Sequence, residues 1–295
     1  TLDSDTQLPI GSANRLVAAM HFPYNRPKLN ATRTRVVEGY GMLQPSVATS
    51  YAGATRTRLT AIWTGNPGMD PYAFAISDPY QDSLGEGIFT GKGIFDVRVF
   101  SEILCERIPD NRVLSHDLLE GGFVRVGLIS DVELLDEMPE TFSAMQMRLH
   151  RWVRGDWQLL GWLLPKACNR RGKKVPVDLS VLTKWQIVDN LRRSLVMPSL
   201  FALIAPGLLL LPGSGIRWLT FVLLTAALPI VRHSLIPGQW NRNAKGIWRT
   251  VLIAAMQFAT LPYQTVMLLD AIVRTLYRLF ISKRRLLEWV QGSQI

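Results

Sequence analysis

The stretch SLVMPSLFALIAPGLLLLPGSGI, residues 194–216, contains no charged side chain and is long enough to cross the hydrocarbon core of a bilayer, although three prolines interrupt it. Two further apolar stretches follow at Trp218–Val231 and Thr250–Leu269, and the second of these is again uncharged. Soluble folds rarely contain several such stretches. We therefore predict membrane helices over residues 191–280, with buried core helices as the alternative.

Basic side chains bracket these apolar stretches. The chain has 295 residues, of which 48% are hydrophobic, and 33 Lys and Arg against 23 Asp and Glu give a formal net charge of +10. The bracketing residues are Arg192, Arg193, Arg217, Arg232, Arg242, Lys245, Arg249, Arg274, Arg278, Lys283, Arg284 and Arg285. Side chains that anchor helices at lipid headgroups have this distribution. We therefore expect a lipid bilayer as a partner, and not nucleic acid.

The same charges leave the membrane topology open. If residues 1–190 face the cytoplasm, the first span leaves the cytoplasm and the second returns, which keeps the basic loop 232–249 inside. A third complete span would place the basic tail 274–285 outside, against the positive-inside rule. Either residues 250–269 form a broken or interfacial helix, or the tail is an exception to the rule.

Residues 1–190 have the mixed pattern of an α/β domain. The spacing of apolar side chains predicts helices over residues 11–20, 94–108, 118–121 and 139–164, and strands ending near residue 5, over 36–45 and over 123–133. Residues 78–93, DPYQDSLGEGIFTGKG, are rich in glycine and polar side chains and are predicted to form a loop. The glycines suit a mobile loop over an acceptor site, with Glu86, Thr90 and Lys92 as the residues that would contact the acceptor.

Asp3-Ser4-Asp5 opens the chain with two carboxylates in a short acidic motif. Two carboxylates at the end of a strand can bind Mg²⁺ or Mn²⁺, and such an ion neutralises a departing diphosphate. A solvated turn is the alternative, because Asp-x-Asp is a short and common pattern.

Asp117 follows an apolar segment in Ser115-His116-Asp117. A carboxylate that lies within hydrogen-bond reach of a sugar hydroxyl can act as its general base, so Asp117 is the candidate catalytic residue and His116 belongs to the acceptor side of the site. Taken alone, the motif is more typical of a helix N-cap, which Ser115 or Asp117 would form for a helix over 118–121.

Residues 148–158, RLHRWVRGDWQ, combine three arginines, two tryptophans and a histidine. Guanidinium groups can hold a diphosphate, and indole faces can stack against glucosyl rings. The residues expected to bind the donor diphosphate or the acceptor are Arg148, His150, Arg151, Trp152, Arg154, Asp156 and Trp157. A helix end lying at a membrane interface is the alternative.

Read together, these segments resemble the glycosyltransferase domain of bacterial cyclic β-1,2-glucan synthases. The matching stretches are TLDSDTQLP (1–9), GYGMLQPSV (39–47), DPYQDSLGEGIFTGKGIFDV (78–97), IPDNRVLSHDLLEGGFVRVGLISDVEL (108–134), RLHRWVRGDWQLLGWL (148–163) and SKRRLLEW (282–289). The resemblance covers nearly the whole chain.

The resemblance implies a fold similar to cellulose-synthase-type transferases, that is, part of a GT-A-type α/β domain followed by transmembrane or interfacial helices. It implies inverting, metal-dependent transfer of glucose from UDP-glucose to a growing β-1,2-glucan that stays linked to protein, with Tyr80 as a candidate attachment residue. It maps the metal motif to Asp3 and Asp5 and the base to Asp117. It maps a Gln-x-x-Arg-Trp motif to Arg148, Arg151 and Trp152, where Arg148 stands in place of the usual Gln.

The resemblance also implies a domain plan and a location. We expect a catalytic part over residues 1–190 whose nucleotide-binding first half is missing, membrane helices over 191–280, and a linker to further domains over 281–295. The location implied is the bacterial inner membrane, with several spans and the catalytic part facing the cytoplasm. Without the first half, the isolated chain should be weakly active or inactive. The rival interpretations are a membrane β-glucan synthase of another linkage and a non-catalytic membrane scaffold.

Overall fold

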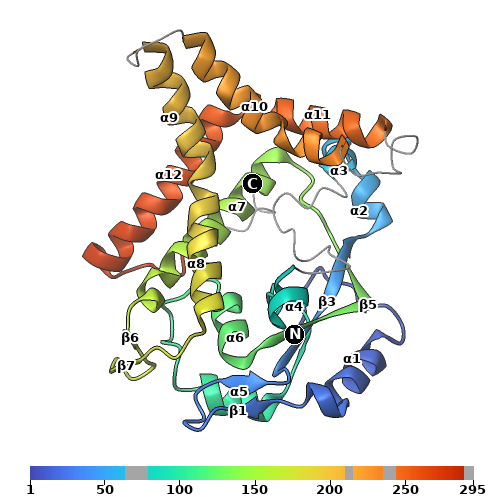
Figure 1. The fold of residues 1–295 in the computed structure, drawn as a ribbon, viewed down its shortest axis with the longest axis vertical. Coiled ribbons are helices and arrows are strands. Elements are labelled where there is room, and N and C mark those ends of the chain that lie inside the picture. Colours follow the sequence, from blue (N-terminus) through green and yellow to red (C-terminus); the bar gives the residue numbers. More distant parts are fainter. Residues whose placement is uncertain (64–78, 210–214, 235–243, 289–295) are drawn as a thin grey trace.

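A three-stranded sheet lies at the centre of the N-terminal part of the molecule, seen in a computed structural model (Figure 1). The structure describes residues 1–63, 79–209, 215–234 and 244–288. The sheet has the order β4-β3-β5, and its strands are β3 (Met42–Thr49), β5 (Val126–Asp136) and the short β4 (Ile94–Phe95). β5 runs parallel to β3, and β4 runs antiparallel to it.

The register of β3 and β5 shifts in the middle of the pair. Pro45 pairs with Ile129, but the next residue, Ser46, pairs with Glu133. Ser46 Oγ donates to the carbonyl oxygen of Val132 at 3.0 Å and so closes the irregular section. Proline offers no amide hydrogen to a sheet ladder, which is a physical reason for the break at this position.

Helices cover both faces of the sheet. Successive residues of a strand point to opposite faces, so Met42 packs in the larger core beneath α6, whereas Leu43 packs with Leu16 of α1. The helices of this part are α1 (Ser12–His21), α2 (Tyr51–Thr55), α3 (Arg58–Trp63), α4 (Pro79–Leu84), α5 (Val97–Leu104), α6 (Asp117–Val124) and α7 (Phe142–Gln158). Two-stranded ribbons β1 (Lys28–Leu29) with β2 (Val36–Glu38), and β6 (Lys166–Cys168) with β7 (Lys174–Pro176), lie at the periphery.

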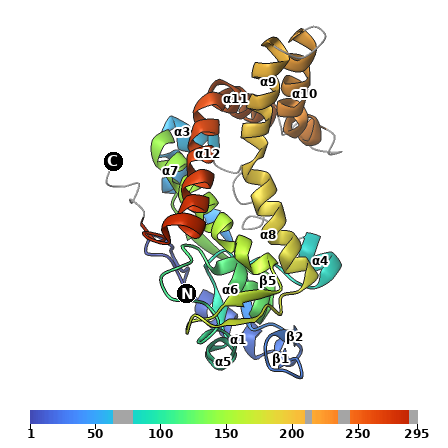
Figure 2. The ribbon, with the colours of Figure 1, turned by 90° about the vertical axis from the view of Figure 1, so that its left-hand side faces the viewer.

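The C-terminal helices rise from this α/β part (Figures 1 and 2). They are α8 (Val181–Ser194), α9 (Val196–Leu209), α10 (Gly215–Ser234), α11 (Ala244–Ala259) and α12 (Leu261–Tyr277), followed by a π-helical turn at Arg278–Ser282. α9 and α10 lie side by side, and a Cβ atom added at Gly207 would come within 2.7 Å of the Trp218 side chain. α12 packs back on α7 through Val153, Leu268 and Ala271.

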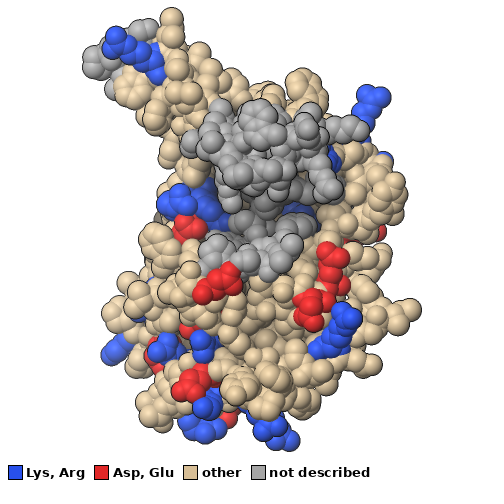
Figure 3. Space-filling view, turned by 45° about the vertical axis from the view of Figure 1, so that its right-hand side comes forward, with Lys and Arg blue, Asp and Glu red and all other residues tan. Residues whose placement is uncertain are grey.

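The protruding helices differ from the α/β part in surface character. Figure 3 shows acidic and basic side chains spread over the lower part of the molecule, whereas the upper helices are largely uncharged except for basic groups at their tip. Exposed apolar side chains follow one another along α12, among them Val266, Val273 and Phe280 beyond its end. Within the described residues, the segment Val181–Leu208 is long and apolar enough to cross a membrane. The pair Val251–Ala259 and Leu261–Ser282, bent by 66°, passes the same test as one broken segment.

Several predictions about the elements are confirmed. The helices predicted over 11–20 and 139–164 correspond to α1 and to α7 with its 3-10 extension, Leu159–Leu163. The helix broken near its centre, one of two alternatives for residues 250–269, is present as the bend between α11 and α12. Part of the expected basic loop 232–249, and the end of the expected linker, lie outside the described residues.

Other predictions are wrong in their boundaries. The loop predicted over 78–93 contains a helix, α4, because the Gln81 side chain is fixed by the hydroxyl of Tyr40 and the amide of Leu128. The strand predicted from residue 123 begins at Val126, since α6 continues to Val124. No strand ends near residue 5 in the described chain. The N-terminal segment forms a turn there, followed by a single bridge between Gln7 and Leu135.

Candidate active site

The glycine-rich loop after α4, residues 85–93, connects two of the predicted site motifs. Lys92 Nζ donates to Asp136 Oδ2 at 2.6 Å and lies 3.1 Å from Asp3 Oδ2. The Lys92 side chain is only 12% exposed. Burial would lower the pKa of Lys92, but Asp136 and Asp3 outweigh this effect and hold it above its ordinary value. One ammonium group thus binds together the loop, the N-terminal segment and the end of β5.

The predicted metal motif lies on the surface beside this ammonium group. The side chain of Asp3 is 61% exposed, and Asp5 is also exposed. The amide of Thr6 donates to the carbonyl of Asp3 at 3.2 Å, so the motif is part of a turn. Carboxylate oxygens are the donors that Mg²⁺ and Mn²⁺ prefer, so the residue types suit such an ion, which would share Asp3 with the ammonium group of Lys92.

The same loop covers the predicted base. Gly91 has a φ of +92°, and a Cβ atom added there would lie 3.4 Å from the carboxylate of Asp117. Asp117 is the first residue of α6, and Ser115 Oγ donates to its Oδ2 at 3.1 Å. Adjacent residues of one loop, Gly91 and Lys92, therefore contact the base and the metal motif.

Asp117 has the electrostatics of an enclosed carboxylate. Burial raises its pKa, and the negative charges of Glu120 and Asp3 add to this rise, while His116 and the hydrogen bond from Ser115 oppose it. The two motifs are remote in the sequence, but they are linked through adjacent loop residues, because Gly91 lies against Asp117 and Lys92 pairs with Asp3.

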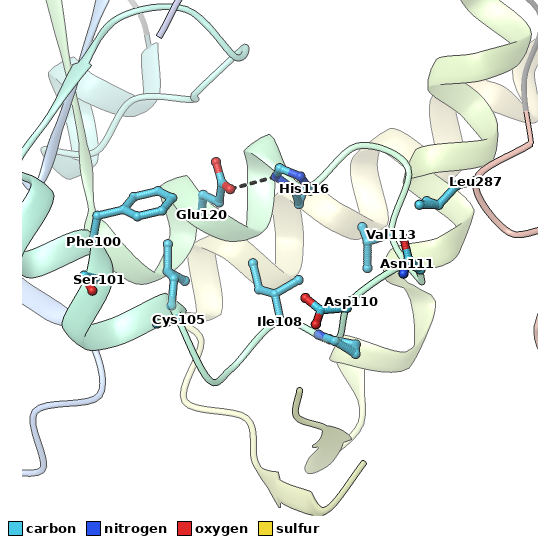
Figure 4. Close-up of a pocket in the computed structure, with 12 residues that line it drawn as sticks. Phe100, Ser101, Cys105, Ile108, Asp110, Asn111, Val113, His116, Glu120 and Leu287 are labelled. Carbon is cyan, nitrogen blue, oxygen red and sulfur yellow. Dashed lines mark ion pairs between the residues drawn. The ribbon is translucent and has the colours of Figure 1, made fainter. Parts of the chain in front are cut away.

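His116 forms an ion pair with Glu120 on the same helix. The distance from His116 Nδ1 to Glu120 Oε1 is 2.7 Å (Figure 4). The hydrogen bond to Glu120 raises the pKa of His116, against the effect of burial. The ligand atoms of His116, Asp117 and Glu120 lie within 4.8 Å of one another, but this ion pair accounts for the proximity of two of them. We interpret the group as an ion pair next to a carboxylate rather than as a metal site.

Helix α7 is joined closely to the segment that carries Asp117. A Cβ atom added at Gly155 would come within 2.8 Å of the Ser115 side chain, and Gln158 Oε1 accepts a hydrogen bond from the amide of Leu114 at 2.6 Å. Arg151 lies one turn before Gly155 on the same face of the helix. The contacts at Gly155 and Gln158 thus join α7 to the segment before Asp117, and a role of Arg151 and Trp152 at the base stays a prediction.

Arg148 and Trp152 interact within α7. The guanidinium carbon of Arg148 lies 5.0 Å from the centre of the Trp152 ring, which is cation–π geometry between residues one turn apart. Both side chains are half-buried. Arg148 therefore orients the Trp152 indole ring.

The remaining predicted binding residues of α7 have partners inside the protein. Arg154 is 4% exposed and donates to the carbonyl oxygens of Glu288 at 2.6 Å and Leu286 at 3.2 Å. His150 Nε2 is hydrogen-bonded to Asp270 of α12 at 3.0 Å. These contacts attach α7 to the C-terminal segment and to α12, and binding of a diphosphate by these two residues stays a prediction.

Asp156 and Trp157 connect α7 to α8. Asn190 Nδ2 donates to Asp156 Oδ1 at 2.9 Å, and burial raises the pKa of Asp156 to about 6. Trp157 Nε1 donates to Ser194 Oγ at 2.9 Å. Sequence reasoning predicts the same binding role for these two residues as for Arg151, whereas the structure places them in a packed helix–helix contact.

The loop residues predicted to contact the acceptor are held from different sides. Thr90 donates through both its amide and its hydroxyl to Oε1 of Gln44, a buried side chain of β3, at 3.0 and 3.1 Å. Glu86 Oε1 lies 3.5 Å from Arg125 Nε. Tyr80 lies in α4, just before this loop. These contacts fix the loop against β3 and β5.

A cavity of about 420 Å³ opens beside His116 and Glu120 (Figure 4). Its walls come from α5, from the segment 108–113 and from Leu287. Asp110 belongs to this wall and is paired with Arg170 at 2.8 Å. His116 and Glu120 line this cavity, but Asp117 does not. The cavity is therefore next to the predicted base without reaching it.

Two residues of the site were absent from the sequence-based predictions. Asp136 ends β5 and accepts the hydrogen bond from Lys92, but four other acidic residues surround it in DVELLDEMPE and no local signal singles it out. Glu120 follows His116 by four positions at the start of a predicted helix, and this spacing is a signal that sequence reasoning can use.

Comparison with known proteins follows the same segments. No protein-family model matches the chain. The chain is 38% identical over 309 aligned residues to the cyclic beta-(1,2)-glucan synthase NdvB of Rhizobium meliloti (strain 1021), and the alignment includes the whole chain. This chain matches a region of a cyclic β-1,2-glucan synthase. The resemblance inferred from the sequence motifs is thereby confirmed.

The matched region is a small part of that cyclic glucan synthase. The chain spans 11% of the length of this relative. The activity, substrates and partners of a cyclic glucan synthase are therefore proposals for this chain.

Proposed function

We propose that this chain carries the acceptor-activating part of an inverting glucosyltransferase, which transfers glucose from UDP-glucose to a growing β-1,2-glucan. The observation that carries the proposal is the loop 85–93, which contacts Asp117 through Gly91 and Asp3 through Lys92. The match to a cyclic glucan synthase region supplies the class of product. The GT-A-type fold belongs to the same proposal, supported by the parallel pairing of β3 and β5 with helices on both faces.

Asp117 is the proposed base of the transfer. It accepts the proton of the 2-hydroxyl group of the acceptor glucosyl unit while that oxygen forms a bond to C1 of the donor glucose. The bond between C1 and the diphosphate oxygen breaks, and UDP leaves. A single displacement inverts the configuration, so an α-linked donor gives a β-linked product. Enclosure under Gly91 limits the access of water to the carboxylate and favours sugar over water as the acceptor.

Asp3 and Asp5 are the proposed holders of Mg²⁺ or Mn²⁺. The bound ion would neutralise charge on the departing diphosphate. Lys92 places a second cation next to Asp3, where it limits the repulsion between the carboxylates of Asp3 and Asp136. Arg151 and Trp152 are the proposed contacts to the diphosphate and to a sugar ring, supported by the approach of α7 to Ser115.

The membrane placement is proposed from the C-terminal helices. The apolar segment Val181–Leu208 and the bent pair formed by α11 and α12 would contact the bilayer, with the α/β part that precedes them in the cytoplasm. The largely uncharged upper surface in Figure 3 supports the contact with lipid. A bacterial inner membrane and several spans are the expected setting.

The test is a transfer assay on the full-length parent protein in membranes. UDP-[¹⁴C]glucose is supplied with Mg²⁺, with Mn²⁺ or with a chelator, and the linkages of the product are analysed for the natural protein and for Asp117→Asn. A β-1,2-linked product that requires both the ion and Asp117 is the expected result. A product of another linkage would indicate a related β-glucan synthase, and no product from folded protein would favour a scaffold.

A further inference from the structure

The ion pair of His116 and Glu120 stands directly beside the proposed base. His116 precedes Asp117 in the chain, and Glu120 lies one helical turn after His116 on α6. His116 Nδ1 and Glu120 Oε1 are 2.7 Å apart, and the Glu120 side chain is only 12% exposed, whereas that of His116 is 48% exposed (Figure 4). An ion pair with one enclosed partner is screened less by water and salt than a surface pair.

The geometry of this pair sets the state of the imidazole ring. Because Nδ1 donates to a carboxylate, the orientation of the ring is fixed and the doubly protonated form is favoured. The hydrogen bond to Glu120 accordingly raises the pKa of His116, and burial opposes this only in part.

The charges around Asp117 come from several elements. α6 supplies His116 and Glu120, the N-terminal segment supplies Asp3, and the loop 85–93 supplies the Gly91 backbone. Glu120 and Asp3 disfavour the ionised carboxylate, as burial does, and His116 favours it.

Titratable groups from outside α6 line the cavity beside His116, and others pair with the loop 85–93. The cavity wall next to His116 contains Cys105 and Asp110, and Asp110 is neutralised by Arg170. Lys92 is bound to Asp136 and Asp3. His116 is therefore the neighbouring cation that counters the enclosure of Asp117.

We propose that Glu120 is a positioning residue that holds His116 as an imidazolium beside Asp117, and that this charge keeps Asp117 ionised so that it can accept a proton. The inference rests on the proposed function, because it takes Asp117 as the base. His116 keeps its proton throughout the cycle. The proton taken from the acceptor hydroxyl group resides on Asp117 and is then released to water.

The test is the pH dependence of transfer by the full-length parent in membranes, measured as kcat and kcat/KM for UDP-glucose. In His116→Gln the acid limb of the profile should move to higher pH by roughly one unit, because an opposite charge next to a carboxylate is lost. The loss of rate should be larger on the acid side of the profile than on the alkaline side, since the base itself is still present. His116→Lys restores a permanent cation and should return the limb toward its natural position.

Two further variants separate charge from structure. Glu120→Gln keeps a hydrogen-bond acceptor for Nδ1 but has two opposing effects, because it weakens the hold on the imidazolium and also removes a negative charge that disfavours ionised Asp117. Its acid limb should therefore move less than that of His116→Gln. Asp110→Asn is the matched control, because it removes a carboxylate from the same cavity wall without touching the pair, and its profile should not move. Thermal unfolding of each variant shows whether it is folded.

The outcomes distinguish this inference from the proposed function. If Asp117→Asn is inactive while His116→Gln leaves the acid limb in place, or lowers the rate equally at every pH, the inference is overturned and the proposed base survives. Should His116→Gln fail to fold, His116→Asn replaces it in the same comparison with His116→Lys. If Asp117→Asn retains full activity, the proposed function itself has failed.

Discussion

Asp117 at the start of α6 and Asp156 near the end of α7 are two enclosed carboxylates in adjoining parts of the molecule, and both have raised pKa values. Their partners differ. Asp156 accepts a hydrogen bond from Asn190 of a neighbouring helix, whereas Asp117 is bound by Ser115 of its own segment and is otherwise covered by the Gly91 backbone. Enclosure of a carboxylate therefore does not by itself identify a reactive group. A carboxylate fastened to a packed helix holds the fold, while one that faces a loop is accessible to a substrate when the loop moves.

The largest effect is expected from removing the carboxylate of Asp117. Asp117→Asn should lower transfer by the full parent by roughly 10²- to 10⁴-fold, the usual contribution of a general base. Exposed Asp131 of β5 provides a matched control, and Asp131→Asn should leave the rate unchanged. The measurement is the initial rate of incorporation of labelled glucose. Equal rates for Asp117→Asn and Asp131→Asn would show that Asp117 is not the base, and that its enclosure is as structural as that of Asp156.

The next effect concerns the ammonium group that fixes the loop. Lys92→Met leaves the enclosed carboxylate of Asp136 without its cation, and should cost about 1–3 kcal/mol of unfolding free energy. Because the loop also covers Asp117, transfer should fall by roughly tenfold or more even in the folded fraction. Chemical denaturation and the rate per folded molecule separate the two effects. A loss of stability without a loss of rate would show that the loop is not part of the site.

Asp156→Asn tests whether the enclosed carboxylate of Asp156 makes the stability of the fold depend on pH. The folded pKa of about 6 lies above the value of about 3.9 in an unfolded chain, so the folded state binds the extra proton between these values. Stability should therefore fall as pH rises from about 4 to about 6 and stay lower above it, by on the order of 1–3 kcal/mol. The asparagine variant should lack this slope and should be at least as stable as the natural protein at pH 7. Unfolding curves at several pH values measure it, and an unchanged slope would contradict the assignment.

The smallest effect is expected at the cation–π pair of α7. Arg148→Gln introduces the residue that the related motif usually has, and removes an interaction worth about 0.5–1 kcal/mol at a partly exposed site. We expect a small decrease in stability and a change in KM for UDP-glucose larger than that in kcat, since Trp152 loses its fixed orientation. Steady-state kinetics on the parent measure both. A large drop in kcat would instead place Arg148 among the groups that act on the transition state.

The sequence predicted the long amphipathic elements and not the ends of short ones. α7 was recognisable from its apolar spacing, but Phe123 and Val124 read as the alternation of a strand although they end α6. The chain changes sharply from helix to strand at Arg125, which has a φ of +58°. A sequence signals such a conformation mainly by glycine, so an arginine gives no warning of it. α4 was missed because its partners, Tyr40 and the amide of Leu128, are remote in the chain.

The candidate site was predicted as residues but not as an arrangement. Asp3 and Asp117 belong to motifs that a resemblance can identify, yet their common neighbour is the loop around Gly91, and only the fold shows it. Within the run of residues 148–158, composition cannot separate side chains that pack against α8 or α12 from those that face the site. The contact of Gly155 with Ser115 makes that separation, because it defines which face of α7 is turned to the base.

The position of α7 has a mechanical consequence. Gly155 of this helix lies against Ser115, and Arg154 donates hydrogen bonds to the carbonyl oxygens of residues 286 and 288. The helix also packs along α12. It is a strut between the helices proposed to contact lipid and the segment that carries the base. A change in the tilt of α12 would therefore displace Ser115 by way of a contact that has no room for even one added methyl group. Bilayer thickness and lateral pressure should then act on the turnover rate without any lipid reaching the sugar.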